Sequence, residues 1–190
     1  MCGSFLVDPD VIPSLTSFAP CPWIQGQFDF GDIYPSQKSP VIVFNSQTDH
    51  YEIRLLPFGF KDVLFGKKTQ IINARSETVQ EKRMFRKAMQ TNRAIVVCSG
   101  FYEWDEHKQR FLFEDNRTLF LAAIILHDSF VILTKASNAS VSMVHPRMPV
   151  IFDENQAKEW LTKPDSIGTL INGASPMLNT RSSFQQISLF

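Results

Sequence analysis

Short runs of β-type residues, spread along most of the chain, constrain the fold more than any other feature of the sequence. Each run is rich in Val, Ile, Leu, Phe or Thr and is separated from the next by turn-forming residues. The runs cover residues 41–44, 51–56, 70–73, 94–98, 110–114, 119–126 and 130–134. Only two segments carry a helical pattern. We therefore expect an α+β fold in which the strands are mainly antiparallel.

Two segments carry the capping residues and the apolar spacing of helices. Thr78 and Glu81 have the spacing of a capping box, and a one-sided apolar stripe follows over residues 84–89. An Asp N-cap with a Gln three residues later predicts a second helix over residues 153–161. Between two β-type runs, Asp115-Asn116 predicts a hairpin turn.

Length and composition bound the class of protein. A chain of 190 residues with 44% hydrophobic residues suits one globular domain over residues 1–190, whose last expected strand covers 184–190. No stretch of eighteen apolar residues and no signal peptide is visible. Three scattered cysteines without a CxxC pair favour neither a disulfide framework nor a zinc site. We expect a cytoplasmic monomer with no membrane contact, no metal and no cofactor.

The formal charges cancel, with 19 Lys and Arg against 19 Asp and Glu. A protein that clamps long duplex DNA by charge should be basic. The balance excludes that class, so any nucleic-acid role must rest on a local basic patch or on a covalent step.

The amino-terminal residues Met1-Cys2-Gly3 contain a possible nucleophile. Methionine aminopeptidase removes the first Met when the second residue is small, and Cys2 would then carry a free α-amine beside its thiol. Their ordinary pKa values are about 7.7–8.0 and about 8.5, so both groups can react near neutral pH. Such an amine condenses with an aldehyde to a Schiff base, and the thiolate then closes a thiazolidine ring. Because many chains have Cys at position 2 by chance, this hypothesis needs partner residues.

Three further segments contain candidate partners. The segment 73–78, Asn-Ala-Arg-Ser-Glu-Thr, leads from a β-type run into the first predicted helix and can present an amide and a guanidinium to an anion. In Gly100–Trp104, aromatic neighbours would desolvate Glu103, raise its pKa and suit it to proton transfer. In the segment 145–149, His145 can titrate near neutral pH and Arg147 can fork onto a phosphate. Each segment alone also suits a purely structural role.

In this order and spacing, Cys2-Gly3 and the three segments resemble the SRAP family, the SOS response-associated peptidases, whose bacterial and human members process abasic sites. The resemblance is strongest over residues 1–161. It implies strands curled into a barrel-like core with a few short helices. It also implies an enzyme that binds single-stranded DNA containing abasic sites, and that is associated with the nucleoid when bound to damaged DNA. Cys2 would form a thiazolidine crosslink with the ring-opened abasic-site aldehyde, after autocatalytic or aminopeptidase removal of Met1.

The resemblance assigns a role to each site residue. Cys2 is the nucleophile, and Asn73 orients its amine or the sugar ring oxygen. Glu103 carries protons during ring opening and Schiff-base formation, and His145 assists proton transfer. The DNA-binding positions are Arg75, Arg83 and Arg147 for phosphates, and Phe60 and Phe65 for base stacking. Stacking is worth about 1–3 kcal/mol per base in other single-strand binders.

The chain departs from the family pattern in three places. Most members carry Arg directly after Cys-Gly, where this chain has Ser4, and many carry Asp after the motif His, where it has Pro146. Bacterial relatives often place tryptophans before the Asn-Ala-Arg strand, in the region that is Phe-rich here over residues 58–65. The loss of an Arg at position 4 predicts weaker DNA affinity with the chemistry intact.

Two other functions stay open. Glutaminase-type amidohydrolases with an N-terminal nucleophile also begin with Cys-Gly, but they carry a His-Arg-Gly segment that this chain lacks. A non-catalytic single-strand binding module would have no need for Glu103 and His145 beside Cys2. In the crosslinking hypothesis, three arginines contact phosphates. At about −0.7 per phosphate, the logarithm of the DNA-binding constant should fall with the logarithm of salt concentration with a slope of about −2.

Overall fold

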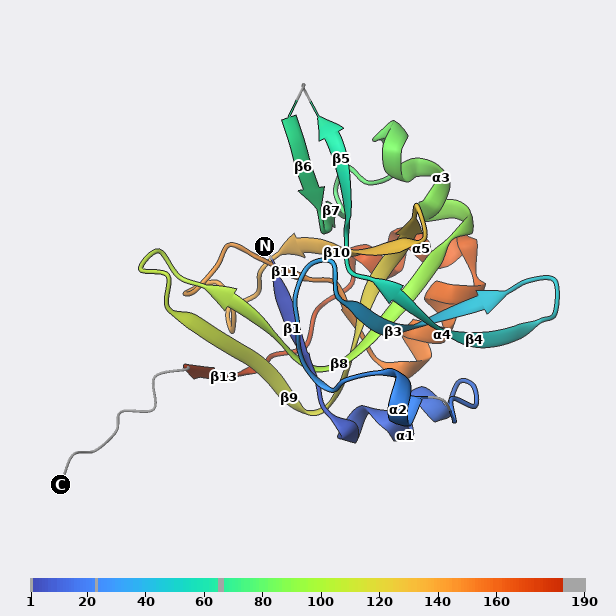
Figure 1. Ribbon diagram of the computed structural model, residues 1–190. Helices are drawn as coiled ribbons and strands as arrows, with labels where there is room; N and C mark the ends of the chain where they lie inside the picture. The colour runs from blue at the N-terminus through green and yellow to red at the C-terminus, as the bar shows by residue number, and fades with distance from the viewer. Residues whose placement is uncertain (1, 23, 65–66, 183–190) are drawn as a thin grey trace.

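Most of the β-type runs form strands of one large sheet, as the computed structural model shows for residues 2–22, 24–64 and 67–182 (Figure 1). The strands are β1 (Ser4–Val7), β2 (Gly31–Ile33), β3 (Lys38–Asn45), β4 (His50–Pro57), β5 (Phe60–Leu64), β6 (Lys67–Ile71), β7 (Asn73–Arg75), β8 (Arg93–Trp104), β9 (Arg110–Leu126), β10 (Ser129–Ala136), β11 (Arg147–Pro149), β12 (Ile151–Phe152) and β13 (Asn179–Ser182). The helices are α1 (Ile12–Thr16), α2 (Ile24–Gln27), α3 (Arg83–Thr91), α4 (Glu154–Thr162) and α5 (Ile167–Asn172), with 3-10 turns at Pro9–Val11 and Pro164–Ser166.

The fold is α+β with a mostly antiparallel sheet and few helices, as predicted. The main path of the sheet runs β11-β10-β9-β8-β1-β2, and β3 and β4 join it through β8. Two described pairings are parallel: β7 runs parallel to β10, and an isolated bridge joins Phe58 to Phe130. The hairpin β5–β6 forms a separate two-stranded sheet.

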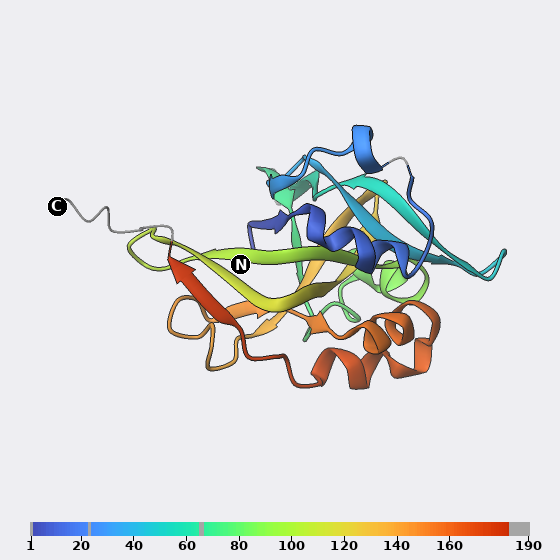
Figure 2. The same ribbon diagram turned by 90° about the horizontal axis from the view of Figure 1, so that it is seen from below.

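The expected barrel is wrong, because the sheet does not close. Its path ends at β2 and β11, and the two strands do not pair within the described chain. The long strand β9 pairs with β13 along its first part and with β10 and β12 along its second. Because β9 changes partners along its length, the sheet branches there, and its edge strands β2 and β11 stay unpaired with each other in the described chain. Figure 2 shows α4 and α5, in orange, on the other side of this strand from β1 and α1, in blue.

The predicted hairpin turn at Asp115-Asn116 is also wrong. These residues lie inside β9, where the pairing with β8 is interrupted: Cys98 pairs with Leu119, and Gly100 pairs with Glu114. The residues between Glu114 and Leu119 therefore oppose Ser99 alone. Extra residues in one strand bend it and increase its twist, so turn-forming residues here bend a strand instead of reversing it.

The two predicted helices have different outcomes. The second is confirmed as α4, where the Asp153 carboxylate accepts from the Gln156 backbone N–H at 2.8 Å and the Gln156 side chain accepts from the Asp153 N–H at 3.0 Å. The first begins later than predicted, at Arg83. The carbonyl of Thr78 accepts from the backbone N–H groups of Glu81 and Lys82, which makes a turn before the helix.

The core is rich in phenylalanine. Phe58 and Phe130 stack with ring centroids 5.3 Å apart, and Phe5 meets Phe58 edge-on at 5.3 Å. These three rings are wholly buried. The strand expected over residues 184–190 lies outside the described residues. No helix in the described part of the chain is long and apolar enough to cross a membrane.

Candidate active site

The strand pairing brings the four predicted catalytic residues together from four separate segments. Cys2 directly precedes β1, and β1 pairs antiparallel with β8 so that Ser4 lies opposite Tyr102. This register places Cys2 at the end of β8 that carries Glu103. On the other side, Asn73 begins β7, and His145 lies two residues before β11; both strands pair with β10.

Hydrogen bonds and short distances connect these four residues. The Asn73 side-chain amide donates to the Cys2 carbonyl oxygen at 2.9 Å. The Cys2 thiol donates to the Ser4 carbonyl oxygen at 3.6 Å. His145 Nδ1 lies 3.8 Å from Glu103 Oε2. Cys2 is fully buried and Glu103 is 1% exposed, so the thiol and the carboxyl are withdrawn from bulk water, whereas the His145 side chain is 22% exposed.

Burial brings the pKa of Glu103 into the range that suits proton transfer near neutral pH. Removal from water disfavours the charged carboxylate and raises the pKa of Glu103 to about 7. Both protonation states are then populated at neutral pH, as general acid–base catalysis requires. Burial also lowers the pKa of His145 below its ordinary 6.5, so the imidazole is mainly neutral at pH 7.

The Cys2 thiol is protonated at neutral pH in this environment. Burial raises its pKa well above the ordinary value, and the nearby Glu103 and Cys98 raise it further. A buried thiol of this kind is a poor first nucleophile because the thiolate is the reactive form. The site therefore favours a reaction in which an amine attacks first and the thiol follows with the help of a base.

Arg147 already holds a carboxylate. Its guanidinium forks onto Glu77 with distances of 2.6 and 2.9 Å and also donates to the Thr134 carbonyl oxygen at 2.6 Å. The hydrogen bonds from Arg147 lower the pKa of Glu77 to about 2, so this carboxylate stays ionised at all ordinary pH values. A phosphate could reach Arg147 only by displacing Glu77. The predicted phosphate contacts Arg75 and Arg83 are both exposed.

Of the two residues predicted to stack on bases, Phe60 is buried and Phe65 lies outside the described residues. Phe60 is 8% exposed, with its ring centroid 5.0 Å from that of His127, so its faces are not open to a base in this conformation. Among the described residues, Tyr34, which follows β2 beside the start of β1, is an aromatic that is 42% exposed. Its hydroxyl donates to Asp32 at 3.2 Å and accepts from Arg110 at 3.1 Å.

Sequence reasoning missed the Glu77–Arg147 pair and assigned no role to Tyr34, although residues 32–37 resemble a loop of the SRAP family. The pair joins residues 70 positions apart, and no local pattern marks such a partnership. Tyr34 lies just beyond β2, one position past the pair of Ile33 with Phe5. A lone tyrosine next to a proline carries no signal of its own in a single sequence.

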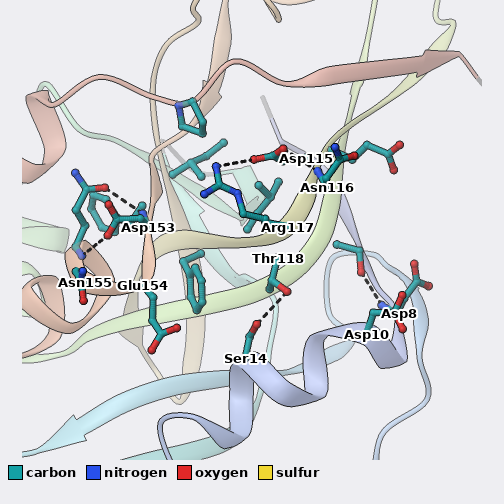
Figure 3. Close-up of a pocket in the computed structure, with 18 of the residues that line it drawn as sticks. Asp8, Asp10, Ser14, Asp115, Asn116, Arg117, Thr118, Asp153, Glu154 and Asn155 are labelled. Atoms are coloured by element: carbon teal, nitrogen blue, oxygen red, sulfur yellow. Dashed lines mark hydrogen bonds and ion pairs between the residues drawn. The ribbon is translucent and has the colours of Figure 1, made fainter.

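A cavity of about 1100 Å³, shown in Figure 3, is lined by other residues than these four. Its charged lining contains two arginines, Arg117 and Arg181, against six carboxylates: Asp8, Asp10, Glu114, Asp115, Asp153 and Glu154. Such a lining repels phosphate, so this cavity is a poor place for a nucleic acid. Among the residues that the structure describes, no group of three or more His, Cys, Asp and Glu side chains is arranged to hold a metal ion.

Known proteins resemble this chain over most of its length. The family model described as SOS response associated peptidase (SRAP) matches residues 1–188. The abasic site processing protein YoqW of Bacillus subtilis is 29% identical over 200 residues, which cover 90% of this chain and 86% of that protein. The abasic site processing protein YedK of Escherichia coli is 28% identical over 143 residues, which cover 68% and 63%.

A solved structure shares the fold. A phage-related protein of Bordetella bronchiseptica superimposes with a TM-score of 0.75 at 21% identity, over 97% of this chain and 95% of that one. The family match spans nearly the whole chain and includes all four gathered residues. This chain belongs to the SOS response associated peptidase (SRAP) family.

Proposed function

We propose that this protein processes abasic sites by capturing them, in single-stranded DNA, as a covalent thiazolidine on Cys2. The observation that carries the proposal is that Asn73 and His145, from two further segments, lie against the buried Cys2 and Glu103. The names of the relatives, abasic site processing proteins, support the same substrate.

The reaction begins when Met1 is hydrolysed and the α-amine of Cys2 becomes free. Glu103 in its protonated form donates to the ring oxygen of the abasic sugar, which opens to the aldehyde. The amine adds to the aldehyde carbon and water leaves, which gives a Schiff base. The thiol then adds to the same carbon, and its proton ends on the ring nitrogen. The sum is aldehyde plus aminothiol giving thiazolidine plus one water.

The neighbouring residues fit these steps. A carboxyl with a pKa of about 7 can give a proton to the sugar and later accept one from the thiol. His145, 3.8 Å from that carboxyl, can relay the proton to solvent because it is partly exposed. The Asn73 amide holds the Cys2 carbonyl and so fixes the direction of the amine at the chain end.

The decisive experiment mixes the protein with single-stranded DNA that carries one abasic site, followed by a denaturing gel. We expect a stable protein–DNA band without reductant, and no band with undamaged DNA. Cys2→Ala should abolish the band, whereas Cys21→Ala, a matched change at another buried cysteine, should retain it. Cys2→Ser should give a band only after borohydride reduction, because it forms the Schiff base without the thiazolidine.

Intact mass provides the companion measurement. We expect the purified protein to lack Met1, and the adduct to weigh one water less than the sum of protein and DNA. Retained Met1 in a protein that still crosslinks would contradict the role of the Cys2 amine. Ammonia release from glutamine without a DNA band would favour the amidohydrolase instead.

Glu103→Gln separates chemistry from binding. The amide keeps the shape of the side chain but cannot exchange protons, so we expect the crosslinking rate to fall far more than the affinity for DNA. An equal loss of both would show that Glu103 acts in binding rather than in proton transfer.

A further inference from the structure

Tyr34 is a surface tyrosine at the end of the sheet where the reactive residues lie. It directly follows β2, which pairs with β1 so that Ile33 lies opposite Phe5. The next position along the two strands places Tyr34 beside Ser4, and Ser4 lies opposite Tyr102 in β8. Tyr34, Ser4 and Tyr102 thus form one row across three chain segments, with about 4.8 Å between neighbouring strands. Ser4 is only two residues from the nucleophile at position 2.

This row belongs to the outer side of the sheet, whereas the reactive groups belong to the inner side. Successive side chains of a strand point to opposite faces, so Tyr102 and Glu103 lie on opposite faces of β8. Glu103 is 1% exposed and Cys2 is wholly buried, whereas Tyr34 is 42% exposed. The sheet therefore separates a buried reactive site from an exposed aromatic ring at the same end of β1.

Two hydrogen bonds hold the Tyr34 ring in place. Its hydroxyl donates to the Asp32 carboxylate at 3.2 Å and accepts from the Arg110 guanidinium at 3.1 Å. Asp32 also accepts from Arg110 at 2.9 Å and from the Tyr102 hydroxyl at 2.7 Å. The Arg110 guanidinium lies over the Tyr102 ring, 4.3 Å from its centroid. Both bonds reach Tyr34 at its hydroxyl, so they fix the ring from its edge.

The backbone of Tyr34 is fixed as well. Its N–H donates to the Gln37 side-chain oxygen at 2.6 Å, and the Gln37 N–H donates to the Tyr34 carbonyl oxygen at 3.0 Å. Between them, Ser36 has a left-handed φ of 78° and donates its N–H to the Phe58 carbonyl oxygen at 2.8 Å. A side chain that is already ordered loses less conformational entropy when it binds a ligand. Tyr34 is therefore a pre-organised aromatic surface.

We propose that Tyr34 stacks on the base of a nucleotide next to the abasic site and so gives the protein a preference for a purine there. The proposal rests on the proposed function, since the abasic sugar is the one that reacts at Cys2. That sugar carries no base and can enter the buried site, whereas the neighbouring base stays at the surface. Exposed aromatic rings bind single strands by stacking on bases. A purine has two fused rings and stacks more strongly than a pyrimidine.

The test uses single-stranded DNA with a tetrahydrofuran abasic analogue, which has no aldehyde and cannot crosslink. The fluorescent base 2-aminopurine, which stacking quenches, is placed on either side of the analogue in turn. We expect the native protein to quench one of the two probes and Tyr34→Ala to abolish that quenching. Met177→Ala, which removes another large exposed side chain, should retain it. Quenching that is equal in the native protein and Tyr34→Ala, or absent at both positions, would overturn the proposal.

The purine preference is measured with the same analogue and an ordinary base at the quenched position. We expect the native protein to bind the purine oligonucleotide more tightly, and Tyr34→Ala to lose about fivefold or more of that affinity. The variant should bind purine and pyrimidine oligonucleotides equally. A purine preference that survives in Tyr34→Ala would contradict the proposal.

Tyr34→Phe guards against a general loss of structure as the explanation. It keeps the ring and removes only the hydroxyl, so it should retain both the quenching and the purine preference. Loss as complete as in Tyr34→Ala would show that the hydroxyl, and not the ring, is what the DNA requires.

The two proposals fail in different ways. If the native protein makes no crosslink but quenches the probe through Tyr34, the thiazolidine chemistry is wrong and the stacking stands. If crosslinking occurs and quenching does not depend on Tyr34, the stacking is wrong and the chemistry stands.

Discussion

Glu103 is a buried carboxyl group that should link the stability of the fold to pH. Its pKa is about 7 in the folded protein, against an ordinary value of 4.5. Below pH 4.5 it is protonated in both the folded and unfolded states. Between pH 4.5 and 7 only the unfolded state loses the proton, so the free energy of unfolding falls as pH rises. The full loss, about 3 kcal/mol, is reached above pH 7.

Glu103→Gln should remove this dependence. We expect the variant to unfold at higher urea concentration than the native protein at pH 8, and at nearly the same concentration at pH 4.5. Glu106→Gln, at a carboxylate whose side chain is 87% exposed, is the matched control and should follow the native protein at both pH values. A Glu103→Gln variant no more stable at pH 8 than the control would mean that Glu103 is solvated.

The ion pair between Glu77 and Arg147 should compete with DNA. Because Glu77 stays ionised above about pH 2, it holds the guanidinium at every working pH. The Glu77 side chain is 48% exposed, and pairs of this kind are worth up to about 1 kcal/mol. We expect Glu77→Gln to tighten reversible binding of single-stranded DNA by up to about fivefold.

Glu81→Gln is the matched control, since it removes another exposed negative charge four residues away. It should tighten binding less than Glu77→Gln does, as measured by fluorescence anisotropy. Weaker binding by Glu77→Gln would show that Glu77 instead holds Arg147 in a productive orientation. At this scale, residue types indicated the chemistry of Cys2, Glu103 and His145, whereas the partner of Arg147 came from 70 positions away.

At the scale of elements, the pairing of β8 with β9 depends on Gly100. A Cβ atom there would lie 2.7 Å from the Phe113 carbonyl oxygen and 2.8 Å from Leu112 Cδ1. We expect Gly100→Ala to lower the free energy of unfolding by about 1–3 kcal/mol, as overpacking does in other cores. Thermal unfolding measures the effect.

Gly168→Ala in α5 is the matched control, because a Cβ there meets no atom within 4 Å. It should leave stability unchanged or raise it by up to about 1 kcal/mol. Equal stability of the two variants would contradict the close approach of β9 to Gly100.

The elements also show where local rules succeed. Helix α4 was predictable because its capping box lies within four consecutive residues. The helix predicted to begin at Thr78 begins at Arg83 instead, because the residues after Thr78 form a hydrogen-bonded turn. The hairpin predicted at Asp115-Asn116 was wrong because turn-forming residues suit a bulge as well as a hairpin. Only the pairing register of β9 with β8 distinguishes the two.

At the scale of the whole molecule, segregated charge should steer DNA although the net charge is zero. The exposed Arg75, Arg83, Arg86 and Lys87 attract phosphate, whereas the cavity of Figure 3, lined by six carboxylates and two arginines, repels it. Such fields act over about a Debye length, roughly 10 Å at 0.1 M salt. We expect the association rate with single-stranded DNA, measured by stopped-flow fluorescence, to fall as salt rises. A rate independent of salt would contradict steering.

The sequence by itself determined the α+β class, the α4 helix and the residue types of the reactive group. These features depend on β-type runs, on helix-capping residues and on side-chain chemistry, all of which act within a few consecutive residues. Only the tertiary structure decided three features: the open sheet, the burial that raises the pKa of Glu103, and the ion pair of Arg147 with Glu77. Each depends on which distant segments meet, and strand pairing decides that across tens of residues.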